Sequence, residues 1–424
     1  MPPDLLRAGH FQTAIFCQGK TLMNTRKIQW RESSGKNFSV AIAGDFSPRE
    51  ENCADVAARA AEITAAVKPF FDTADVKVLQ WECTITRQDT PIAKCGPNHR
   101  CYPECTAFAR SLGIDTVLLA NNHTGDYGDP GVKDTLEILD GLGIRHVGAG
   151  MNEAEAARPL YIEYQGLRAA VINAAEHEFG IAYGDRAGAN ALDPIRIASL
   201  IKEEKSRNDL VIVTLHGGHE HYPYPSPRMR SWFRFFADCG ADLVFNCHTH
   251  CPLGYEIYNG VPIVYSPGNF YFPNRIGSLP CWYIGYVPKF FLDDQGAFAL
   301  ELLPYFNYKA GLKLMDEAET ARFFDYLDRI SAPIADEKEL QKLFDAWSAS
   351  SGYFSLAFDR KKPESFDDPQ AVASVLVSRN LFTCQSHNDL VRNSMLLMER
   401  FQLKEAQKVM DVIETAQNPE FVKL

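Results

Sequence analysis

Apolar runs of strand length alternate with helix-like segments along much of the chain, and this alternation limits the fold more than any other feature. The first series predicts strands at 38–43, 76–81 and 116–120 and near His146, with helices at 53–70, 103–112 and 131–142. Alternation of strand and helix is typical of parallel sheets covered by helices. We therefore expect an α/β fold.

A second series of the same kind follows and ends differently. It predicts strands at 167–173, 210–215 and 242–246, with helices at 194–204 and 228–239. Two further apolar segments, 255–258 and 261–265, are joined by Asn259-Gly260. This pair predicts an antiparallel hairpin, because both turn positions need a positive φ. The sheets are therefore expected to be mixed.

The 424 residues are enough for one large domain with an appendage. Residues 1–37 show little periodicity and are interpreted as an N-terminal extension. The segments 316–348 and 366–418 have helical patterns, so residues 306–424 are expected to form a mainly helical C-terminal region. The main domain is predicted to span 38–305.

Charge and hydropathy exclude some classes of partner. The net charge is −11 and no long basic block occurs, which disfavours binding to nucleic acid. The sequence has no signal peptide pattern and no apolar stretch near the ~18 residues that span a bilayer. We expect a soluble, cytoplasmic protein without a membrane anchor in this chain.

The chain has 11 cysteines, an odd number that is typical of reduced, mostly buried thiols. The densest group contains Cys83, Cys95, Cys101 and Cys105, with His99 among them. These spacings differ from the tight pairs of zinc ribbons. A structural zinc site and simple core packing are the two interpretations.

Oxygen and imidazole donors follow the predicted strands, where α/β folds place their ligands. These residues are Asp45, Glu82, Asn122, His123, His216, His248 and His250. In an extended segment the two imidazoles of His248-Thr249-His250 point the same way and can reach one site or two adjacent metals. A polar surface loop is the alternative. Residues 275–278, with Trp282 and Tyr283, either line a cleft or belong to the core.

These motifs carry a resemblance to a known family. Gly44-Asp45, Asn121-Asn122-His123-x-x-Asp126-x-Gly128, His216-x-Gly-x-Glu220, His248-x-His250 and Ser266-x-Gly268-Asn269-Phe270 resemble, in this order, bacterial capsule-synthesis proteins of the CapA type. That family is associated with poly-γ-glutamate capsules and is distantly related to calcineurin-like metallophosphoesterases. The likeness covers residues from about 38 to about 305. It implies a four-layer αββα sandwich with mixed sheets, followed here by the C-terminal helical extension.

The resemblance also implies roles. Asp45 and His250 bind a first metal, Glu82 bridges, and a second metal is bound by Asn122, His216 and His248. His123 acts as a catalytic acid oriented by Asp126, and Glu220 is placed in the same catalytic group. Substrate contacts are expected from Asn121, His219 and Asn269. Two divalent ions about 3.5–4 Å apart would activate a water, and the mixed donors suit Mn, Fe or Zn.

One residue departs from the phosphoesterase pattern. Ser47 stands where a His ligand usually follows the first Asp, so one metal and two metals are both open. The expected function is a metal-dependent, phosphoesterase-like hydrolase acting on a small-molecule or polymer substrate. A non-catalytic accessory role in biosynthesis, and metal-dependent chemistry on a γ-glutamyl or amide substrate, are the alternatives. A homo-oligomer formed through the C-terminal helices is a further expectation.

Overall fold

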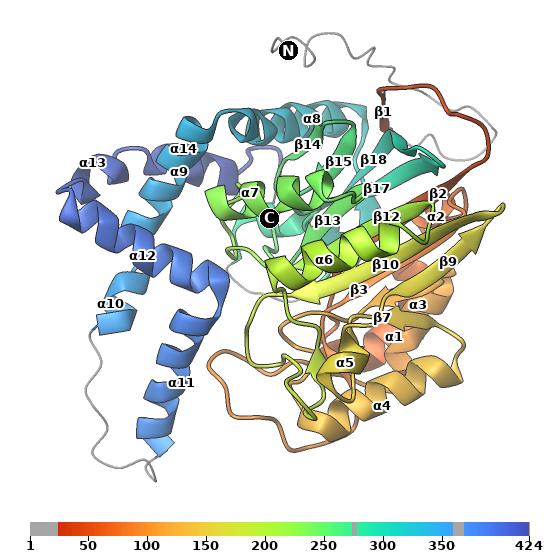
Figure 1. The fold of residues 1–424 in the computed structure, drawn as a ribbon, viewed down its shortest axis with the longest axis horizontal. Coiled ribbons are helices and arrows are strands. Elements are labelled where there is room, and N and C mark those ends of the chain that lie inside the picture. The colour runs from red at the N-terminus through yellow and green to blue at the C-terminus, as the bar shows by residue number, and fades with distance from the viewer. Residues whose placement is uncertain (1–23, 274–277, 359–368, 424) are drawn as a thin grey trace.

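Two β-sheets form the centre of the molecule in the computed structural model, which describes residues 24–273, 278–358 and 369–423 (Figure 1). Along the larger sheet the strands lie in the order β1 (Arg26–Gln29), β18 (Gly296–Tyr308), β17 (Ile284–Asp293), β2 (Asn37–Phe46), β3 (Val76–Trp81), β6 (Thr116–Leu118) and β7 (Arg145–Val147). The last four run parallel, whereas β17 is antiparallel to both β2 and β18. The short strands β16 (Asn269–Tyr271) and β19 (Gly311–Leu314) pair with β2 and β18.

The smaller sheet is also mixed. Its strands lie in the order β14 (Tyr255–Tyr258), β15 (Val261–Val264), β13 (Leu243–Cys247), β12 (Leu210–His216), β10 (Leu167–Ala175) and β9 (Leu160–Tyr164). The four inner strands are parallel and the two edge strands are antiparallel to their neighbours. Asn259 and Gly260 join β14 to β15 with φ values of 51° and 87°. The predicted hairpin is therefore confirmed.

Both faces of each sheet are buried, which makes four layers. In β2, Val40 and Ile42 face the core between the sheets, while Ala41 and Ala43 face the helices. In β12, Ile212 faces the inner core, and Val211 and Val213 face outward. The outer face of the larger sheet is covered by α1 (Cys53–Thr64), α2 (Lys68–Phe71), α3 (Ala107–Leu112) and α4 (Gly128–Gly141), and that of the smaller sheet by α6 (Pro194–Lys205) and α7 (Pro227–Asp238).

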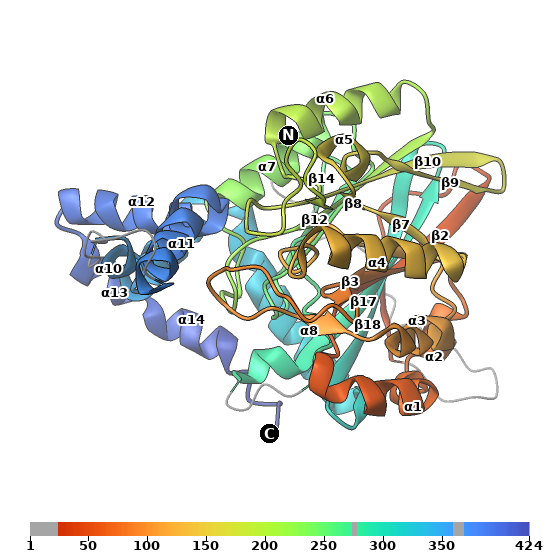
Figure 2. The same ribbon diagram turned by 90° about the horizontal axis from the view of Figure 1, so that it is seen from below.

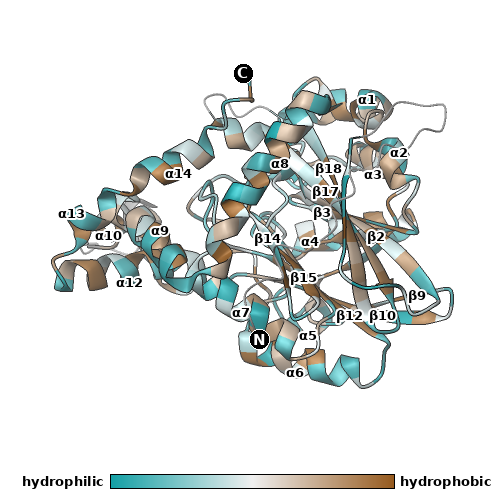
Figure 3. Cartoon of the chain, turned by 90° about the horizontal axis from the view of Figure 1, so that it is seen from above, coloured by the Kyte–Doolittle hydropathy of each residue, from teal (hydrophilic) through white to brown (hydrophobic). Residues whose placement is uncertain are grey.

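The predicted four-layer αββα sandwich with mixed sheets and C-terminal helices is confirmed. In Figure 3 the central strands are coloured mainly as hydrophobic residues, whereas the outer helices alternate hydrophilic and hydrophobic residues. Small elements complete it: α5 (Glu153–Ala156) and the short pairs β4 (Thr84–Ile85) with β5 (Arg100–Cys101) and β8 (Ala149–Gly150) with β11 (Gly188–Ala189). The domain limits 38–305 stay a prediction, and strands of the larger sheet lie on both sides of them.

Two predicted helices are interrupted at prolines. The expected helix 53–70 is divided into α1 and α2, where Pro69 stands in the first turn of α2. The expected helix 316–348 is divided into α8 (Glu317–Ser331) and α9 (Glu337–Ser350) by a 3-10 turn that contains Pro333. Proline has no N–H to donate within a helix, so it is tolerated only in the first turn.

The C-terminal helices extend to one side of the sandwich (Figure 2). They are α10 (Tyr353–Phe358), α11 (Pro369–Thr383), α12 (Gln385–Glu399), α13 (Leu403–Gln407) and α14 (Met410–Gln417). Residues 1–23 of the predicted extension and 366–368 of the last predicted helix lie outside the described residues. Among the helices of the described ranges, none combines the length and the apolar character needed to cross a membrane.

The cysteine group belongs to the core. Cys83, Cys101 and Cys105 are buried among the apolar residues between the larger sheet and its helices. In the described part of the chain, two groups of side chains could hold a metal ion, and neither contains a cysteine. The core interpretation is therefore confirmed for these three cysteines, whereas Cys95 is half-buried and lies outside this core, and the described residues give the zinc interpretation no support.

Candidate metal centre

Six donor residues from both sheets meet at the carboxyl ends of the parallel strands. Asp45 lies at the end of β2, Glu82 directly follows β3, and Asn122 lies in the loop after β6. His216 ends β12, and His248 and His250 follow β13. All six side chains are buried. The structure thus brings together every residue that was predicted to bind metal.

Local backbone features hold these donors in place. Gly44 lets β2 approach the neighbouring loop, since a Cβ there would lie 2.1 Å from the carbonyl oxygen of Gly268. His248 and His250 have φ values of 104° and 57°. Positive φ is uncommon for residues with a side chain, and strained backbone positions of this kind cluster at functional sites.

Four donors converge around His216. Its Nε2 atom lies 3.1 Å from Asn122 Oδ1, 3.1 Å from His248 Nδ1 and 3.5 Å from Glu82 Oε1. Two imidazole nitrogens, an amide oxygen and a carboxylate oxygen form a ligand set of the mixed kind that suits Mn, Fe or Zn. This group corresponds to the second predicted metal site.

An adjoining group shares Glu82 with the first. Donor atoms of Asp45, Glu82 and His250 all lie within 4.8 Å of one another. His250 Nε2 is 3.8 Å from Glu82 Oε1, while its Nδ1 atom is 3.0 Å from Asn269 Oδ1. Hydrogen bonding of Nδ1 to Asn269 leaves Nε2 for a ligand, so Asn269 orients this histidine.

A divalent cation fits the chemistry of these donors. Within the described residues, Asp45 Oδ1, both carboxylate oxygens of Glu82 and the Ser47 hydroxyl are buried without a hydrogen-bond partner. Buried polar atoms are rarely left in this state without an ion or water. Ser47 supplies only a hydroxyl at the position where phosphoesterases place a histidine.

The electrostatics of the site agree with this fit. Burial raises the pKa of Asp45 to about 7 and, together with the negative charge of Asp45, raises the pKa of Glu82 well above its usual value. Burial also lowers the pKa of His250 to about 3 and that of His216 well below its usual value. The lowered pKa values favour the neutral, metal-binding form of His216 and His250, and cations would offset the cost of charging the carboxylates.

His123 lies beside the metal ligands in a hydrogen-bonded group. Its Nδ1 atom is 2.6 Å from Asp126 Oδ2, and its ring stacks on that of His99 with centroids 4.0 Å apart. The Lys94 ammonium lies 2.5 Å from Asp126 Oδ1 and 3.2 Å from His123 Nδ1. The sequence predicted the pairing of His123 with Asp126 but gave no role to Lys94.

The other predicted site residues lie around these groups. The Asn121 amide donates to the carbonyls of Trp81 and Leu119, so it holds the loop. Glu220 is exposed at the rim, and its charge contributes to the raised pKa of Asp45. His219 is turned away, because its Nε2 atom is hydrogen-bonded to the Ser386 carbonyl oxygen at 2.8 Å.

One further residue near the metal ligands, Glu178, was missed at the sequence level. Glu178 Oε1 lies 3.8 Å from His248 Nε2, and the segment Glu176-His177-Glu178 follows β10 as the predicted ligands follow their strands. That strand-end position was the available signal. Trp282, which was expected in a cleft or in the core, is buried with its ring 4.8 Å from that of His250. Residues 275–277 of the same expectation lie outside the described residues.

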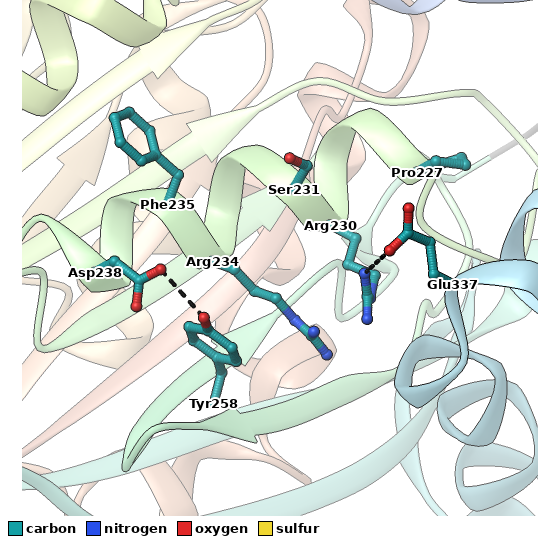
Figure 4. A pocket seen from close by; sticks show the side chains of 8 residues that line it. All are labelled: Pro227, Arg230, Ser231, Arg234, Phe235, Asp238, Tyr258 and Glu337. Atoms are coloured by element: carbon teal, nitrogen blue, oxygen red, sulfur yellow. Dashed lines mark hydrogen bonds and ion pairs between the residues drawn. The ribbon is translucent and has the colours of Figure 1, made fainter.

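A separate hollow of about 330 Å³ lies between α7, β14 and the start of α9 (Figure 4). In it, Arg230 Nη1 is 3.7 Å from Glu337 Oε2, and the Tyr258 hydroxyl donates to Asp238 Oδ2 at 3.1 Å. No predicted site residue lines this hollow, so it is distinct from the metal centre.

The fold and the site define a class: a four-layer α/β sandwich with two adjoining groups of carboxylate and imidazole donors at its strand ends. Residues 39–274 match the family described as bacterial capsule synthesis protein PGA_cap. Because the match covers more than half of the chain, the protein belongs to this family.

Similar proteins carry related names. The capsule biosynthesis protein CapA of Bacillus anthracis is 32% identical over 207 residues, which are 47% of this chain and 50% of that protein. The PGA biosynthesis protein CapA of Bacillus subtilis is 30% identical over 210 residues, 49% of this chain and 55% of that protein. A probable polyglutamine synthesis accessory protein of Mycobacterium tuberculosis is 30% identical over 208 residues, which are 46% of this chain and 55% of that protein. The chain spans about half the length of these curated relatives.

Solved structures give weaker likenesses. A phosphatase from Mycoplasma pneumoniae has a TM-score of 0.43 at 12% identity over 64% of this chain and 94% of its own. A putative 5′-nucleotidase from Staphylococcus aureus has a TM-score of 0.40 at 14% identity, over 69% of this chain and 59% of its own. At these scores the likeness is slight, and the fold is established by the sheets themselves.

Proposed function

We propose that the protein is a metal-dependent hydrolase of phosphoester bonds. The observation that supports this most is Glu82, a buried carboxylate shared by two adjoining donor groups and left without hydrogen-bond partners in the described residues. When bound there, divalent ions would lower the pKa of a water and neutralise charge that develops on the phosphoryl oxygens.

The chain's own residues bind the cations, donate a proton and exclude water. The cations are held by the six donors Asp45, Glu82, Asn122, His216, His248 and His250. His123 is placed to protonate the leaving oxygen, with Asp126 on its other ring nitrogen at 2.6 Å. Phe272 and Trp282 pack beside His250, with ring centroids 5.2 and 4.8 Å from it, and exclude water from that side.

The donors also bear on metal number. The group around His216 has four side-chain donors, whereas the group around His250 has three, with Ser47 as its nearest counterpart to a fourth. We propose that Mn, Fe or Zn binds first in the four-donor group and more weakly in the other.

A second candidate function is metal-dependent hydrolysis of a γ-glutamyl or other amide bond. The observation that favours it is the set of names carried by the relatives, which refer to capsule, PGA and polyglutamine synthesis. Metal ions that polarise a phosphoryl oxygen can also polarise a carbonyl oxygen. An accessory role without catalysis is the remaining alternative.

Hydrolysis assays separate these functions. The protein, loaded in turn with Mn²⁺, Fe²⁺ and Zn²⁺, is tested on a phosphomonoester, a phosphodiester and a γ-glutamyl anilide, beside His123→Ala. The proposal expects phosphoester turnover that falls by about 100-fold or more in the variant. Turnover of the anilide alone would favour the second function. A metal-loaded protein that hydrolyses none of them would favour the accessory role.

A further inference from the structure

Lys94 is a buried lysine with no part in the roles assigned so far. It lies in the loop between β4 and β5, and only 4% of its side chain is exposed. The loop is tied to the backbone of Asp126, whose carbonyl oxygen accepts from Ile92 N at 2.9 Å and from Asn98 Nδ2 at 3.1 Å. The position of the lysine is therefore fixed by the fold as well as by its own contacts.

The ammonium group holds one side of the Asp126 carboxylate. Lys94 Nζ donates to Oδ1 at 2.5 Å, and His99 N donates to Oδ2 at 2.6 Å. With one donor on each oxygen, the carboxylate cannot turn without breaking a buried charge-assisted bond. The orientation of Asp126 is thus set before His123 is considered.

The same arrangement selects the free nitrogen of His123. Its Nδ1 atom lies 2.6 Å from Asp126 Oδ2, and its ring stacks on His99 at an interplanar angle of 7°. A ring nitrogen has a single hydrogen-bonding direction, and Asp126 Oδ2 at 2.6 Å lies nearer to Nδ1 than Lys94 Nζ at 3.2 Å. Nδ1 is therefore engaged by Asp126, and Nε2 remains for a substrate. Removing Lys94 would free the carboxylate to turn and would leave its charge without a partner.

We propose that Lys94 is a positioning residue that, through Asp126, fixes His123 with Nε2 toward the leaving group. The inference rests on the proposed hydrolase function. In the step concerned, a water oxygen forms a bond to phosphorus and the bond from phosphorus to the leaving oxygen breaks. The electron pair stays on the leaving oxygen, which takes the proton from His123 Nε2. The attacking water loses one proton to solvent, and His123 Nε2 regains one proton from solvent, so that overall water and ester become alcohol and phosphate.

The test compares kcat on two phosphate esters whose leaving groups differ in how much they need protonation. Lys94→Met is compared with wild type on 4-nitrophenyl phosphate, whose leaving group needs little protonation, and on phenyl phosphate, which needs more. We expect kcat on phenyl phosphate to fall at least about 10-fold more than kcat on 4-nitrophenyl phosphate, at unchanged metal content. The matched control is Lys289→Met, which also removes a buried ion pair, that of Lys289 Nζ with Glu301 Oε2 at 2.7 Å.

A second variant controls for the possibility that Lys94→Met fails to fold because it leaves a buried carboxylate unpaired. The double variant Lys94→Met with Asp126→Asn leaves no unpaired carboxylate, and we expect the same selective loss because the residues act as a unit. Equal losses on both esters, or a selective loss in Lys289→Met as well, would overturn the role of Lys94. A metal-loaded wild-type protein that hydrolyses neither these two esters nor the phosphodiester would instead overturn the proposed function.

Discussion

At the scale of single residues, the site depends on backbone positions that admit little substitution. Gly44 is the clearest case, because β2 must pass close to Gly268 for Asp45 to reach the other donors. The strained φ values of His248 and His250 belong to the same edge of the sandwich. The backbone conformations of these residues, which the sequence alone does not reveal, thus set the positions of the donor side chains.

Gly44→Ala tests this closeness. The added Cβ would lie 2.1 Å from a backbone oxygen, which must move, so the free energy of unfolding is expected to fall by about 2–3 kcal/mol. Gly141→Ala is the control, because nothing lies within 4 Å of its Cβ and it stands in α4. Urea unfolding of both variants measures the difference, and equal stability of Gly44→Ala and wild type would contradict the close approach.

The identity of the ligand residues was accessible from the sequence because each follows a strand, and strand ends of parallel sheets meet at one edge. Lys94 and His99 were not accessible in the same way. They lie in a loop without a periodic pattern, and only the fold brings them against His123 and Asp126. The roles of the ligand residues stay predictions, whereas their proximity is a feature of the structure.

At the scale of elements, α12 is fastened to the strand-end loops by buried polar groups. Arg228 Nη2 donates to Glu176 Oε1 at 2.6 Å, and its Nε atom donates to Asp389 Oδ2 at 2.5 Å. His219 Nε2 donates to the carbonyl oxygen of Ser386. This helix therefore packs close to Glu178 and the metal centre, although it lies outside the segment that matches the family.

The buried His219 predicts a dependence of stability on pH. Burial and the charge of Arg228 lower its pKa to about 3 in the folded protein, against about 6.5 when unfolded. Its contribution is therefore complete above pH 6.5 and is lost as the pH falls toward 3. Between pH 7 and pH 5 the free energy of unfolding should fall by about 1–2 kcal/mol more in wild type than in His219→Gln.

Urea unfolding at the two pH values measures this slope, with His146→Gln on strand β7 as the control. A His219→Gln protein that loses as much stability as wild type between pH 7 and pH 5 would show that this histidine is not buried in its neutral form.

Strands β17 and β18 were not predicted from the sequence pattern. Both are long and buried on both faces, so they lack the alternation of a half-exposed strand. Pro288 and Pro304 interrupt their apolar runs. Strand β1 was concealed for another reason, since its four residues were too short to show a period.

At the scale of the whole molecule, the alternation of strands and helices predicted an α/β fold with mixed sheets, and the four-layer order came from the family resemblance that the motifs carry. The packing of the C-terminal helices was not accessible from the sequence, because their contacts with residues 176–178 join segments about 200 positions apart, as with Gln385 and His177. Long-range polar contacts of this kind leave no periodic signal.

The expected homo-oligomer is a prediction at this scale. The C-terminal helices expose Phe382, Leu396 and Phe401, which supports a contact between two copies. Sedimentation at micromolar concentration should give twice the mass of one chain, and Phe382→Asp with Leu396→Asp should give the single-chain mass. A wild-type protein that sediments as one chain over this range would contradict the prediction.

The central claim is that the strand-end donors bind divalent metal, and elemental analysis of the purified protein tests it most directly. The variants are Glu82→Ala, which removes the shared ligand, and Glu301→Gln, a control at a carboxylate of β18 that pairs with Lys289. We predict between about one and two equivalents of Mn, Fe or Zn in wild type and in the control, with the four-donor group filled first, and loss in Glu82→Ala. Wild-type protein without bound metal, even after incubation with Mn²⁺ or Zn²⁺, would contradict the account.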